Sequence, residues 1–210
     1  MNWYEKRQLL VKDLGQILVG NGVVKFGTFT LSSGKISPYY IDLRLVPSFP
    51  EVFSKVITAY ENSLKGLIGL DNVDAVGGVP TSGLTYAAVV AYNLKKPLIY
   101  VRKENKTYGT EKEVEGVLKP GYKIALIDDL ITTGGSLVKT IDTLRQKGVE
   151  VDNVIVLIDR LEGGANLLAE KGIKLNAITN IGELADLLHG MEIIDSEQYG
   201  HIKSQIKADS

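Results

Sequence analysis

Residues 124–136, Ile-Ala-Leu-Ile-Asp-Asp-Leu-Ile-Thr-Thr-Gly-Gly-Ser, decide the fold of this 210-residue chain. Four apolar residues lead directly into two carboxylates, a Thr/Gly/Ser turn follows, and an amphipathic helix is predicted from Leu137 to Lys147. A continuous apolar run bounded by turn residues is typical of a strand that is buried on both faces, as in parallel sheets. We therefore expect the two carboxylates at the carboxyl end of a parallel strand, where open α/β sheets bind ligands.

The turn after the carboxylates has the composition of an anion site. Its five residues, 132–136, place closely spaced backbone N–H groups just ahead of a helix. Those donors lack intrahelical partners, and the helix dipole is positive there. An acid after a strand and a Gly/Thr turn before a helix also occur for N-capping alone, so each piece by itself indicates little. Taken together in this order, the two carboxylates can accept hydrogen bonds from hydroxyls, and the neighbouring backbone N–H groups can bind a phosphate. This combination indicates a site for a phosphorylated sugar.

Composition excludes several classes of protein. Hydrophobic residues make up 44% of the chain and charged residues 23%, as in ordinary globular proteins. The 24 basic and 25 acidic residues nearly cancel, so no global charge favours nucleic acid or a membrane. The absence of cysteine excludes disulfides, thiolate nucleophiles and cysteine-ligated zinc. The apolar stretches are too short to span a bilayer and the first residues lack a signal-peptide pattern, so we expect a cytoplasmic protein.

Most of the chain alternates strands with helices. The expected strands are 73–76, 98–101, 124–127, 154–158 and 173–178. Strands that alternate with helices favour an α/β fold, in which helices flank a parallel sheet. A predicted helix and hairpin precede this pattern and indicate a small N-terminal hood. We therefore expect a single domain over 1–210, with the hood at about 1–45 and the α/β core at 46–210.

Two further segments carry candidate binding chemistry. The segment 77–83, Gly-Gly-Val-Pro-Thr-Ser-Gly, is a second glycine-rich turn after a predicted strand. A polar loop from 102 to about 117 begins with three cations and one anion within 102–108. Such a run is usually a solvated loop, but this one follows a short strand of the same sheet, and its Gly and Thr content suits a mobile lid. No P-loop and no dinucleotide fingerprint is present, which argues against ATPase and dehydrogenase functions.

In their order along the chain, these motifs resemble those of the type I phosphoribosyltransferases. The strand, the two acids and the Thr/Gly loop resemble the family's signature for phosphoribosyl pyrophosphate (PRPP). The likeness narrows to orotate phosphoribosyltransferase, because residues 102–109 resemble its catalytic loop, Arg-Lys-x-x-Lys-x-His/Tyr-Gly. Residues 25–40 resemble its hood, and 159–164 resemble its Asp-Arg-x-x-Gly-Gly segment. The resemblance implies a type I phosphoribosyltransferase-like parallel sheet flanked by helices, with a small N-terminal hood.

The resemblance also implies an activity and roles for particular residues. The implied reaction transfers the phosphoribosyl group of PRPP to orotate, giving orotidine 5-phosphate and pyrophosphate in de novo pyrimidine (UMP) biosynthesis. Lys103, Lys106 and Asp129 are expected to be catalytic, and Thr132 and Arg160 to bind orotate. The residues expected to bind PRPP are Arg102, Lys103, Lys106, Tyr108, Asp128, Asp129, Leu130, Ile131, Thr132, Thr133, Gly134, Gly135 and Ser136. No metal site made by the protein alone is implied, and Mg²⁺ is expected to be bound mainly through PRPP.

The family's catalytic loop reaches the partner subunit's site, so the resemblance further implies a homodimer with a shared loop. The chain departs from the family pattern at Ser32, at Thr81-Ser82, where many members have Tyr-Lys, and at Tyr108, where many have His. Protonation of the leaving group is therefore not assigned to Tyr108. Three other functions share parts of this pattern: a PRPP-sensing regulator, a phospho-acceptor receiver domain and a purine phosphoribosyltransferase. The cationic segment argues against the first and the Thr/Gly loop against the second, while only the hood and Arg160 argue against the third.

Overall fold

The computed structural model describes residues 3–30, 34–102 and 113–209. The helices are α1 (Trp3–Gly20), α2 (Pro50–Ser63), α3 (Ser82–Leu94), α4 (Gly135–Arg145), α5 (Gly164–Glu170), α6 (Ile181–Gly190) and α7 (Ser196–Asp209), with short turns η1 (Leu43–Ser48), η2 (Leu64–Ile68) and η3 (Leu70–Asn72). The strands are β1 (Val24–Thr30), β2 (Ile36–Ile41), β3 (Ala75–Gly78), β4 (Leu98–Val101), β5 (Val114–Glu115), β6 (Lys123–Ile131), β7 (Glu150–Asp159) and β8 (Lys174–Asn180).

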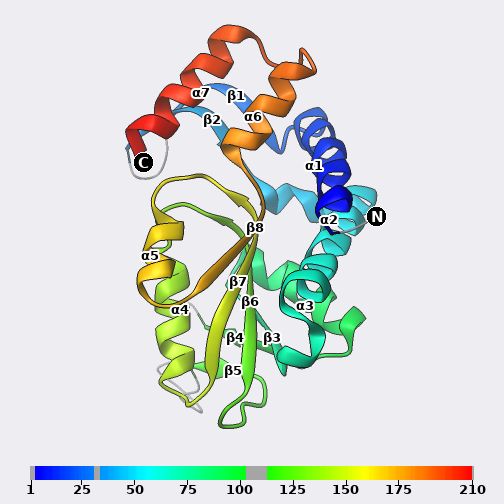
Figure 1. The fold of residues 1–210 in the computed structure, drawn as a ribbon, viewed down its shortest axis with the longest axis vertical. Helices are drawn as coiled ribbons and strands as arrows, with labels where there is room; N and C mark the ends of the chain where they lie inside the picture. The colour runs from blue at the N-terminus through cyan, green and yellow to red at the C-terminus, as the bar shows by residue number, and fades with distance from the viewer. Residues whose placement is uncertain (1–2, 31–33, 103–112, 210) are drawn as a thin grey trace.

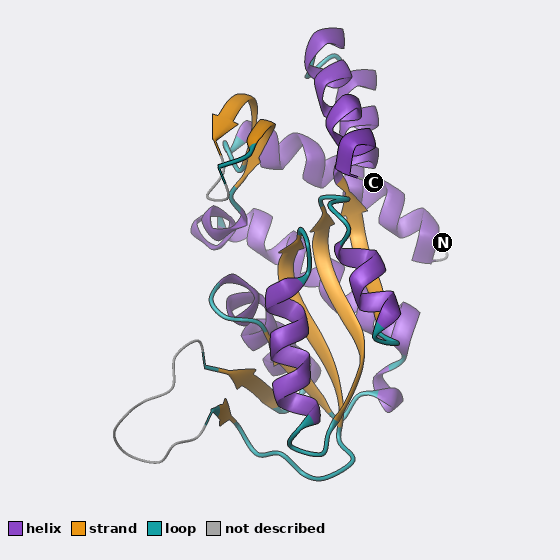
Figure 2. Cartoon of the chain, turned by 90° about the vertical axis from the view of Figure 1, so that its left-hand side faces the viewer, coloured by secondary structure: helices purple, strands orange, loops and turns teal. Residues whose placement is uncertain are grey.

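A six-stranded sheet forms the centre of the molecule, and helices cover both of its faces (Figure 1). The strand order is β5-β4-β3-β6-β7-β8, and each neighbouring pair is parallel except β4 with β5. The predicted α/β fold with a mostly parallel sheet is thus confirmed. The long central strands end towards the β1–β2 hairpin, so their carboxyl ends and the hairpin lie at the same end of the sheet (Figure 2).

Strand β6 lies between β3 and β7, which explains its continuous apolar sequence. Ile127 faces a core cluster that includes Val56, Tyr60 and Tyr86 of α2 and α3, whereas Leu126 faces a cluster with α4. Successive side chains of a strand point to opposite faces, so a strand with helices on both sides needs apolar residues at every position. Figure 1 shows the helices of these two layers on opposite sides of the sheet.

The signature strand is longer than the sequence predicts. We expected it to end at Ile127, but it continues to Ile131, with Asp128 paired to Val156 and Ile131 to Asp159 of β7. The reason is that β7 extends equally far and supplies backbone partners for these residues. The two carboxylates therefore lie within the last part of a strand, which fixes their backbone more rigidly than a loop does.

The N-terminal elements share their core with the sheet. Val11 and Leu14 of α1 and Tyr39 of β2 belong to the same buried cluster as Ile127 and Ile155. Helix α7 contacts β2, and the hairpin lies beside α6 and α7 at the top of Figure 1. Within the described ranges no helix is both long enough and apolar enough to cross a membrane.

The prediction of a polar loop from 102 to about 117 is wrong near the end of this range, where strand β5 pairs antiparallel with β4. A two-residue strand carries too little alternation to be recognised from sequence. The segment 103–112 within this loop lies outside the described residues.

Candidate functional site

A cavity of ≈ 510 Å³ lies at the carboxyl ends of β3 and β6. Three segments form it: the β3–α3 loop, the end of β6 with the loop before α4, and turn η1. Its lining residues are Arg44, Val79, Pro80, Thr81, Ser82, Asp128, Asp129, Leu130, Ile131, Thr132, Gly134, Ser136 and Leu137. The cavity thus brings the two carboxylates together with the N-terminus of α4. Of the residues predicted to accompany them, Thr133 is an exposed position of the same loop, and Gly135 is the exposed first residue of α4.

The two carboxylates have different environments. Asp128 is 8% exposed, and its Oδ1 accepts a hydrogen bond from the backbone N–H of Asp129 at 2.9 Å. Burial, and then the neighbouring Asp129 carboxylate, raises the pKa of Asp128 well above its usual range, although N–H donors from Asp129 and Gly83 oppose the shift. Asp129 is partly exposed, and its Oδ1 accepts from the N–H of Leu130 at 2.9 Å. Asp129 is therefore the carboxylate that is more open to the cavity.

Gly83 lets helix α3 approach the signature strand closely. A Cβ atom at Gly83 would lie 2.6 Å from Ile127 O and 2.7 Å from Asp128 Oδ1. The short loop before it contains a cis peptide bond between Pro80 and Thr81. The close approach brings the N-terminus of α3 to the Asp128 carboxylate, so both glycine-rich turns noted in the sequence border one cavity.

Two buried tyrosines hold the frame of the cavity together. Tyr60 of α2 donates a hydrogen bond from its hydroxyl to the backbone oxygen of Asp128 at 2.8 Å. Tyr86 of α3 donates to the backbone oxygen of Leu43 in η1 at 2.6 Å. The two rings lie 5.6 Å apart, and burial is the main cause that raises the pKa of each phenol. Both tyrosines are therefore neutral donors that connect η1, α2 and α3 to the signature strand.

The loop before α4 has the geometry of an anion site. Gly134 adopts a left-handed conformation with φ 81° and directly precedes the helix, which begins at Gly135. The N–H groups of the first helical turn have no intrahelical acceptor, so they are available to an anion. Gly164 packs against this loop and donates its N–H to Thr132 O at 2.9 Å. This hydrogen bond fixes the loop before α4, which we predict to bind phosphate, to the segment after β7.

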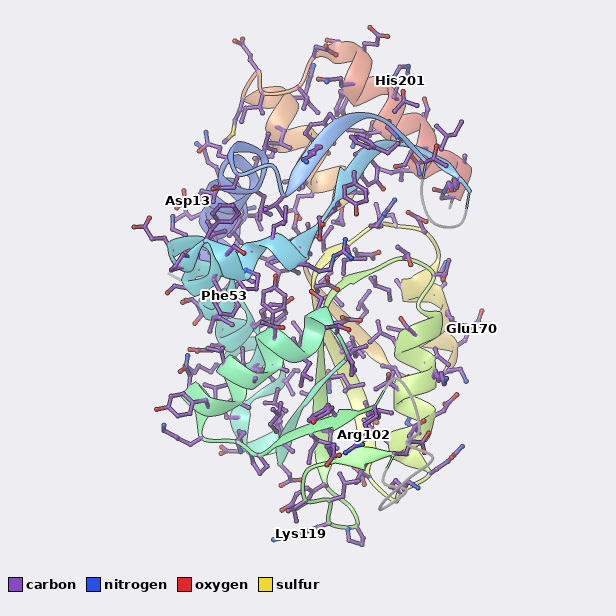
Figure 3. All side chains as sticks on the ribbon, turned by 180° about the vertical axis from the view of Figure 1, so that it is seen from behind. Asp13, Phe53, Arg102, Lys119, Glu170 and His201 are labelled. Atoms are coloured by element: carbon purple, nitrogen blue, oxygen red, sulfur yellow. The ribbon has the colours of Figure 1, made fainter. Side chains whose placement is uncertain are left out.

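Arg102 lies beside the cavity but outside its lining. It follows β4 (Figure 3) and lines a smaller cavity of ≈ 180 Å³ that shares Val79, Pro80 and Ser136 with the larger one. Its guanidinium forms an ion pair with Glu115 of β5. Three other predicted residues of this loop, Lys103, Lys106 and Tyr108, lie outside the described residues.

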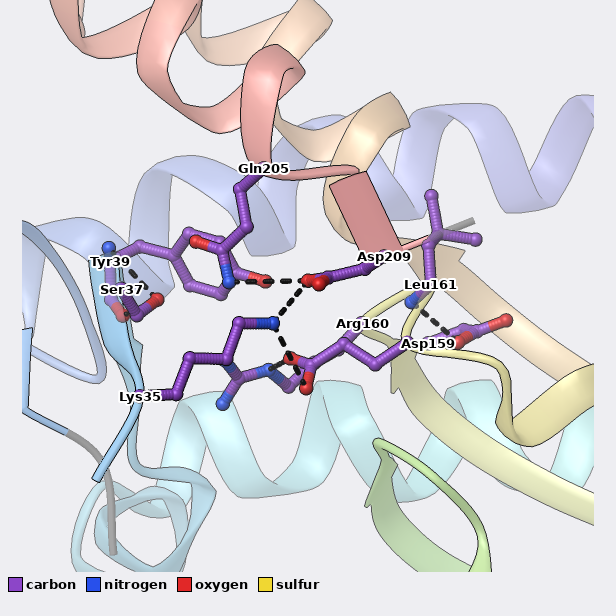
Figure 4. A network of polar contacts seen from close by, with 9 residues as sticks. Lys35, Ser37, Tyr39, Asp159, Arg160, Leu161, Gln205 and Asp209 are labelled. Carbon is purple, nitrogen blue, oxygen red and sulfur yellow. Dashed lines mark hydrogen bonds and ion pairs between the residues drawn. The ribbon is translucent and has the colours of Figure 1, made fainter. Parts of the chain in front are cut away.

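Arg160 occupies a polar cluster outside the cavity lining, between β2 and α7 (Figure 4). Its guanidinium carbon lies 4.9 Å from the centroid of the Tyr39 ring, and its Nε lies 2.8 Å from Glu162 Oε1. This ion pair lacks hydrogen-bond geometry, so Arg160 Nε and Nη2 and Glu162 Oε1 are buried without a hydrogen bond among the described residues. Lys35 joins the cluster through ion pairs with Asp209 of α7 and, at 3.9 Å, with Glu162.

The unsatisfied donors make Arg160 a candidate for ligand binding. Arg160 is 6% exposed, and buried donors without acceptors cost stability that a ligand acceptor can recover. Its backbone N–H donates to Ile131 O at 3.0 Å, which ties it to the residue preceding Thr132. The structure thus joins Arg160 to the predicted phosphate loop through the main chain, while its side chain points to the hairpin.

Sequence reasoning missed Arg44, Tyr60, Tyr86, Lys35 and Glu162. Tyr60 and Tyr86 lie in helices α2 and α3, where an aromatic residue in the sequence indicates packing rather than a polar contact. Arg44 and Lys35 lie near the hairpin strands without a recognisable motif. Only Glu162 was adjacent to a predicted site residue, and its position within the 159–164 segment was a signal that could have been followed.

Comparison with known proteins relates the chain to one enzyme family. Residues 50–186 match the family model described as Phosphoribosyl transferase domain. The chain is 38% identical over 197 residues to the orotate phosphoribosyltransferase of Cenarchaeum symbiosum (strain A), covering 94% of this chain and 98% of that one. It is 44% identical over 172 residues to the orotate phosphoribosyltransferase of Pyrobaculum aerophilum, covering 81% and 87%. The crystal structure of orotate phosphoribosyltransferase from Aeropyrum pernix matches with a TM-score of 0.75 and 37% identity, covering 87% of this chain and 99% of that one.

Proposed function

Because the chain belongs to the phosphoribosyl transferase domain family, and within it to the orotate phosphoribosyltransferases, we propose that it transfers the phosphoribosyl group of PRPP to orotate. The products are orotidine 5-phosphate and pyrophosphate, and the reaction is a step of UMP biosynthesis. The observation that carries this function is the ≈ 510 Å³ cavity, in which Asp128 and Asp129 meet the N-terminus of α4.

The end of β6 and the following loop bind the ribose 5-phosphate part of PRPP in this proposal. Asp128 and Asp129 accept hydrogen bonds from the two ring hydroxyls, and the N–H groups from Thr132 to Ser136 bind the phosphate. The strand backbone and the Tyr60 hydroxyl fix the carboxylates, so the sugar is held in one orientation. Rigid positioning of a reactant is a large source of rate enhancement.

In the chemical step, the bond between the anomeric carbon and pyrophosphate is replaced by a bond to orotate. The bond to the pyrophosphate oxygen breaks, and pyrophosphate leaves with the electron pair. The N1 atom of orotate forms the new bond with inversion, and the proton of N1 is released. The sugar passes through an oxocarbenium-like state, as in glycoside cleavage. The Asp129 carboxylate, which lines the cavity, stabilises the positive charge that develops on the sugar.

Arg160 and Thr132 bind orotate in this proposal. The guanidinium of Arg160 lies over the Tyr39 ring, which restrains its orientation, and its planar fork suits a planar carboxylate. Its buried and unsatisfied Nη2 donor supports this role, because a carboxylate oxygen would complete its hydrogen bonding. The ion pair with Glu162 keeps the guanidinium in place before the substrate binds.

The cationic loop acts on the pyrophosphate side. Arg102, Lys103, Lys106 and Tyr108 bind PRPP, and the two lysines neutralise the charge that grows on the leaving group. Closing this loop excludes water, which otherwise hydrolyses PRPP. The family resemblance supports a homodimer in which this loop reaches the partner subunit's site. A cytoplasmic location remains the expectation from the sequence pattern.

We propose that Mg²⁺ would be held mainly by PRPP oxygens, and that Asp129 is the protein carboxylate available to it. The donor set of the cavity fits this arrangement: Asp129 is partly exposed, whereas the pKa of the buried Asp128 carboxyl is raised, which disfavours the anion that a metal needs. When bound, Mg²⁺ neutralises part of the pyrophosphate charge.

Loss of orotate absorbance on mixing the protein with PRPP and Mg²⁺ tests the function directly. We expect turnover of orotate and none of adenine or hypoxanthine. Turnover of a purine base without turnover of orotate would contradict the substrate assignment.

Asp129→Asn should impair both PRPP binding and turnover, and normal kinetics in this variant would contradict its role. Partial recovery of activity on mixing Lys106→Ala subunits with Asp129→Asn subunits is expected if the loop acts across a dimer.

A further inference from the structure

One positively charged side chain, Arg44, shares the large cavity with the two carboxylates. Arg44 lies in η1, between the hairpin and α2, and it is the one cation among the described residues that line this cavity. Asp128 and Asp129 are the acidic side chains of the same lining. Two carboxylates and one guanidinium give the lining an excess of negative charge, which repels a polyphosphate unless the guanidinium contacts the phosphate groups directly.

Neighbouring side chains hold the guanidinium of Arg44 in a fixed orientation although it is 66% exposed. Nε donates to Asp42 Oδ1 at 2.6 Å, and Nη2 donates to Asp42 Oδ2 at 2.9 Å and to the Tyr40 hydroxyl at 3.1 Å. Hydrogen bonds from Arg44 are the main cause that lowers the pKa of Asp42. Nη1 has no hydrogen bond among the described residues, so the fork keeps two N–H donors for a ligand.

The tyrosine pair positions Arg44 on the α3 side of the cavity. Tyr86 donates to the carbonyl of Leu43, the residue before Arg44, and lies about one helical turn after Ser82. The ring of Tyr86 contacts that of Tyr60, which donates to Asp128. The hydrogen bond to Leu43 therefore ties the turn that carries Arg44 to α3, the helix that follows the Thr81-Ser82 loop, and Arg44, Thr81 and Ser82 line the same cavity.

We propose that Arg44 is a substrate-binding residue that contacts the pyrophosphate group of PRPP. This inference rests on the proposed function. The N-terminus of α4 takes the 5-phosphate, and the other glycine-rich turn that lines the cavity, at Thr81-Ser82, carries no charged side chain. The pre-oriented Nη1 donors of Arg44 supply a charge-assisted contact at that side.

Calorimetric titration with magnesium pyrophosphate tests this role in wild type, Arg44→Ala, Arg44→Lys and a matched control, Lys55→Ala. Lys55 pairs with Asp13 on the surface at 3.1 Å, so its removal changes the net charge equally without touching the cavity. We expect Arg44→Ala to bind pyrophosphate about tenfold to a hundredfold more weakly, because one contact to a charged group is lost. Arg44→Lys should be intermediate, and Lys55→Ala should match the wild type.

Ribose 5-phosphate is the second probe, because a structural role would weaken both ligands. We expect its affinity to be unchanged in Arg44→Ala, and the KM for PRPP to rise more than kcat falls. Pyrophosphate affinity equal to that of Lys55→Ala, or an equal loss for both ligands, would overturn the inference. If the wild type fails to turn over orotate, the proposed function fails, but the pyrophosphate comparison still decides the role of Arg44.

Discussion

Substitution of Gly83 by alanine tests how closely α3 must approach the signature strand. The added Cβ would lie 2.6 Å from Ile127 O, 2.7 Å from Asp128 Oδ1 and 2.8 Å from Asp128 Cα. Two of these neighbours are backbone atoms of a strand paired on both sides, so they cannot rotate away. We expect the N-terminus of α3 to shift outwards by roughly 0.8 Å to restore ordinary contact distances.

The expected energies follow from this displacement. Overpacking of this kind costs about 1–3 kcal/mol. The helix propensity of alanine over glycine offsets about 1 kcal/mol of that. The remaining loss of about 0–2 kcal/mol lowers Tm by up to about 8 °C for a chain of this size. Activity should fall further than stability, because the shift moves the Thr81-Ser82 loop and the Gly83 N–H that faces Asp128. A misplacement near 1 Å can reduce the rate about a hundredfold.

Thermal unfolding and orotate turnover measure the two effects separately. Gly200→Ala is the control: it lies in α7, and a Cβ there meets nothing within 4 Å. We expect Gly200→Ala to keep full activity with a Tm equal to or slightly above that of the wild type. Wild-type Tm and wild-type kcat/KM in Gly83→Ala would refute the reasoning, since they would mean that α3 and β6 are not in contact at this point.

Three further outcomes are expected. Asp128→Asn should be more stable than the wild type at pH 7. Burial raises the pKa of Asp128 in the folded protein above the usual 3.8, so the wild type loses stability as the pH rises from 3.8 through that raised pKa. The difference in Tm between the two proteins should therefore shrink near pH 4. Tyr60→Phe should cost about 1–3 kcal/mol in denaturant unfolding, because Asp128 O loses a buried donor, whereas Tyr199→Phe, at an exposed pair, should cost less. Arg160→Lys should raise the KM for orotate about tenfold and leave that for PRPP unchanged, because lysine lacks the planar fork; an equal rise in both would contradict its assignment.

The parts of the fold that local sequence patterns determine were predictable. Residues 124–127 are apolar at every position because helices cover both faces of β6, and that pattern alone indicates a buried parallel strand. The acids and the Thr/Gly loop follow within the same stretch of chain, so their proximity required no knowledge of tertiary structure. The roles assigned to these residues remain predictions.

The long-range contacts that frame the cavity and the Arg160 cluster could not be predicted in this way. Tyr60 and Asp128 are 68 residues apart in sequence, Tyr86 and Leu43 are 43 apart, and Lys35 and Asp209 are 174 apart. Hydrogen bonds between residues so far apart in the sequence do not affect the local periodicity of apolar residues, because each residue fits its own helix or strand pattern whether or not the partner is present. The extension of β6 to Ile131 escaped prediction for the same reason, since its partners belong to β7.

Stability and ligand binding make opposite demands at Asp128. A buried carboxyl beside a second carboxylate is unfavourable in its charged form, and asparagine would relieve that cost. A ribose hydroxyl, in contrast, needs the charged acceptor, and its hydrogen bond would lower the pKa of Asp128 in the complex. Binding of PRPP should therefore release a proton from Asp128, so the affinity for PRPP should increase as pH rises through the pKa of the free protein. In Asp128→Asn this pH dependence should disappear together with most of the affinity, while the fold gains stability.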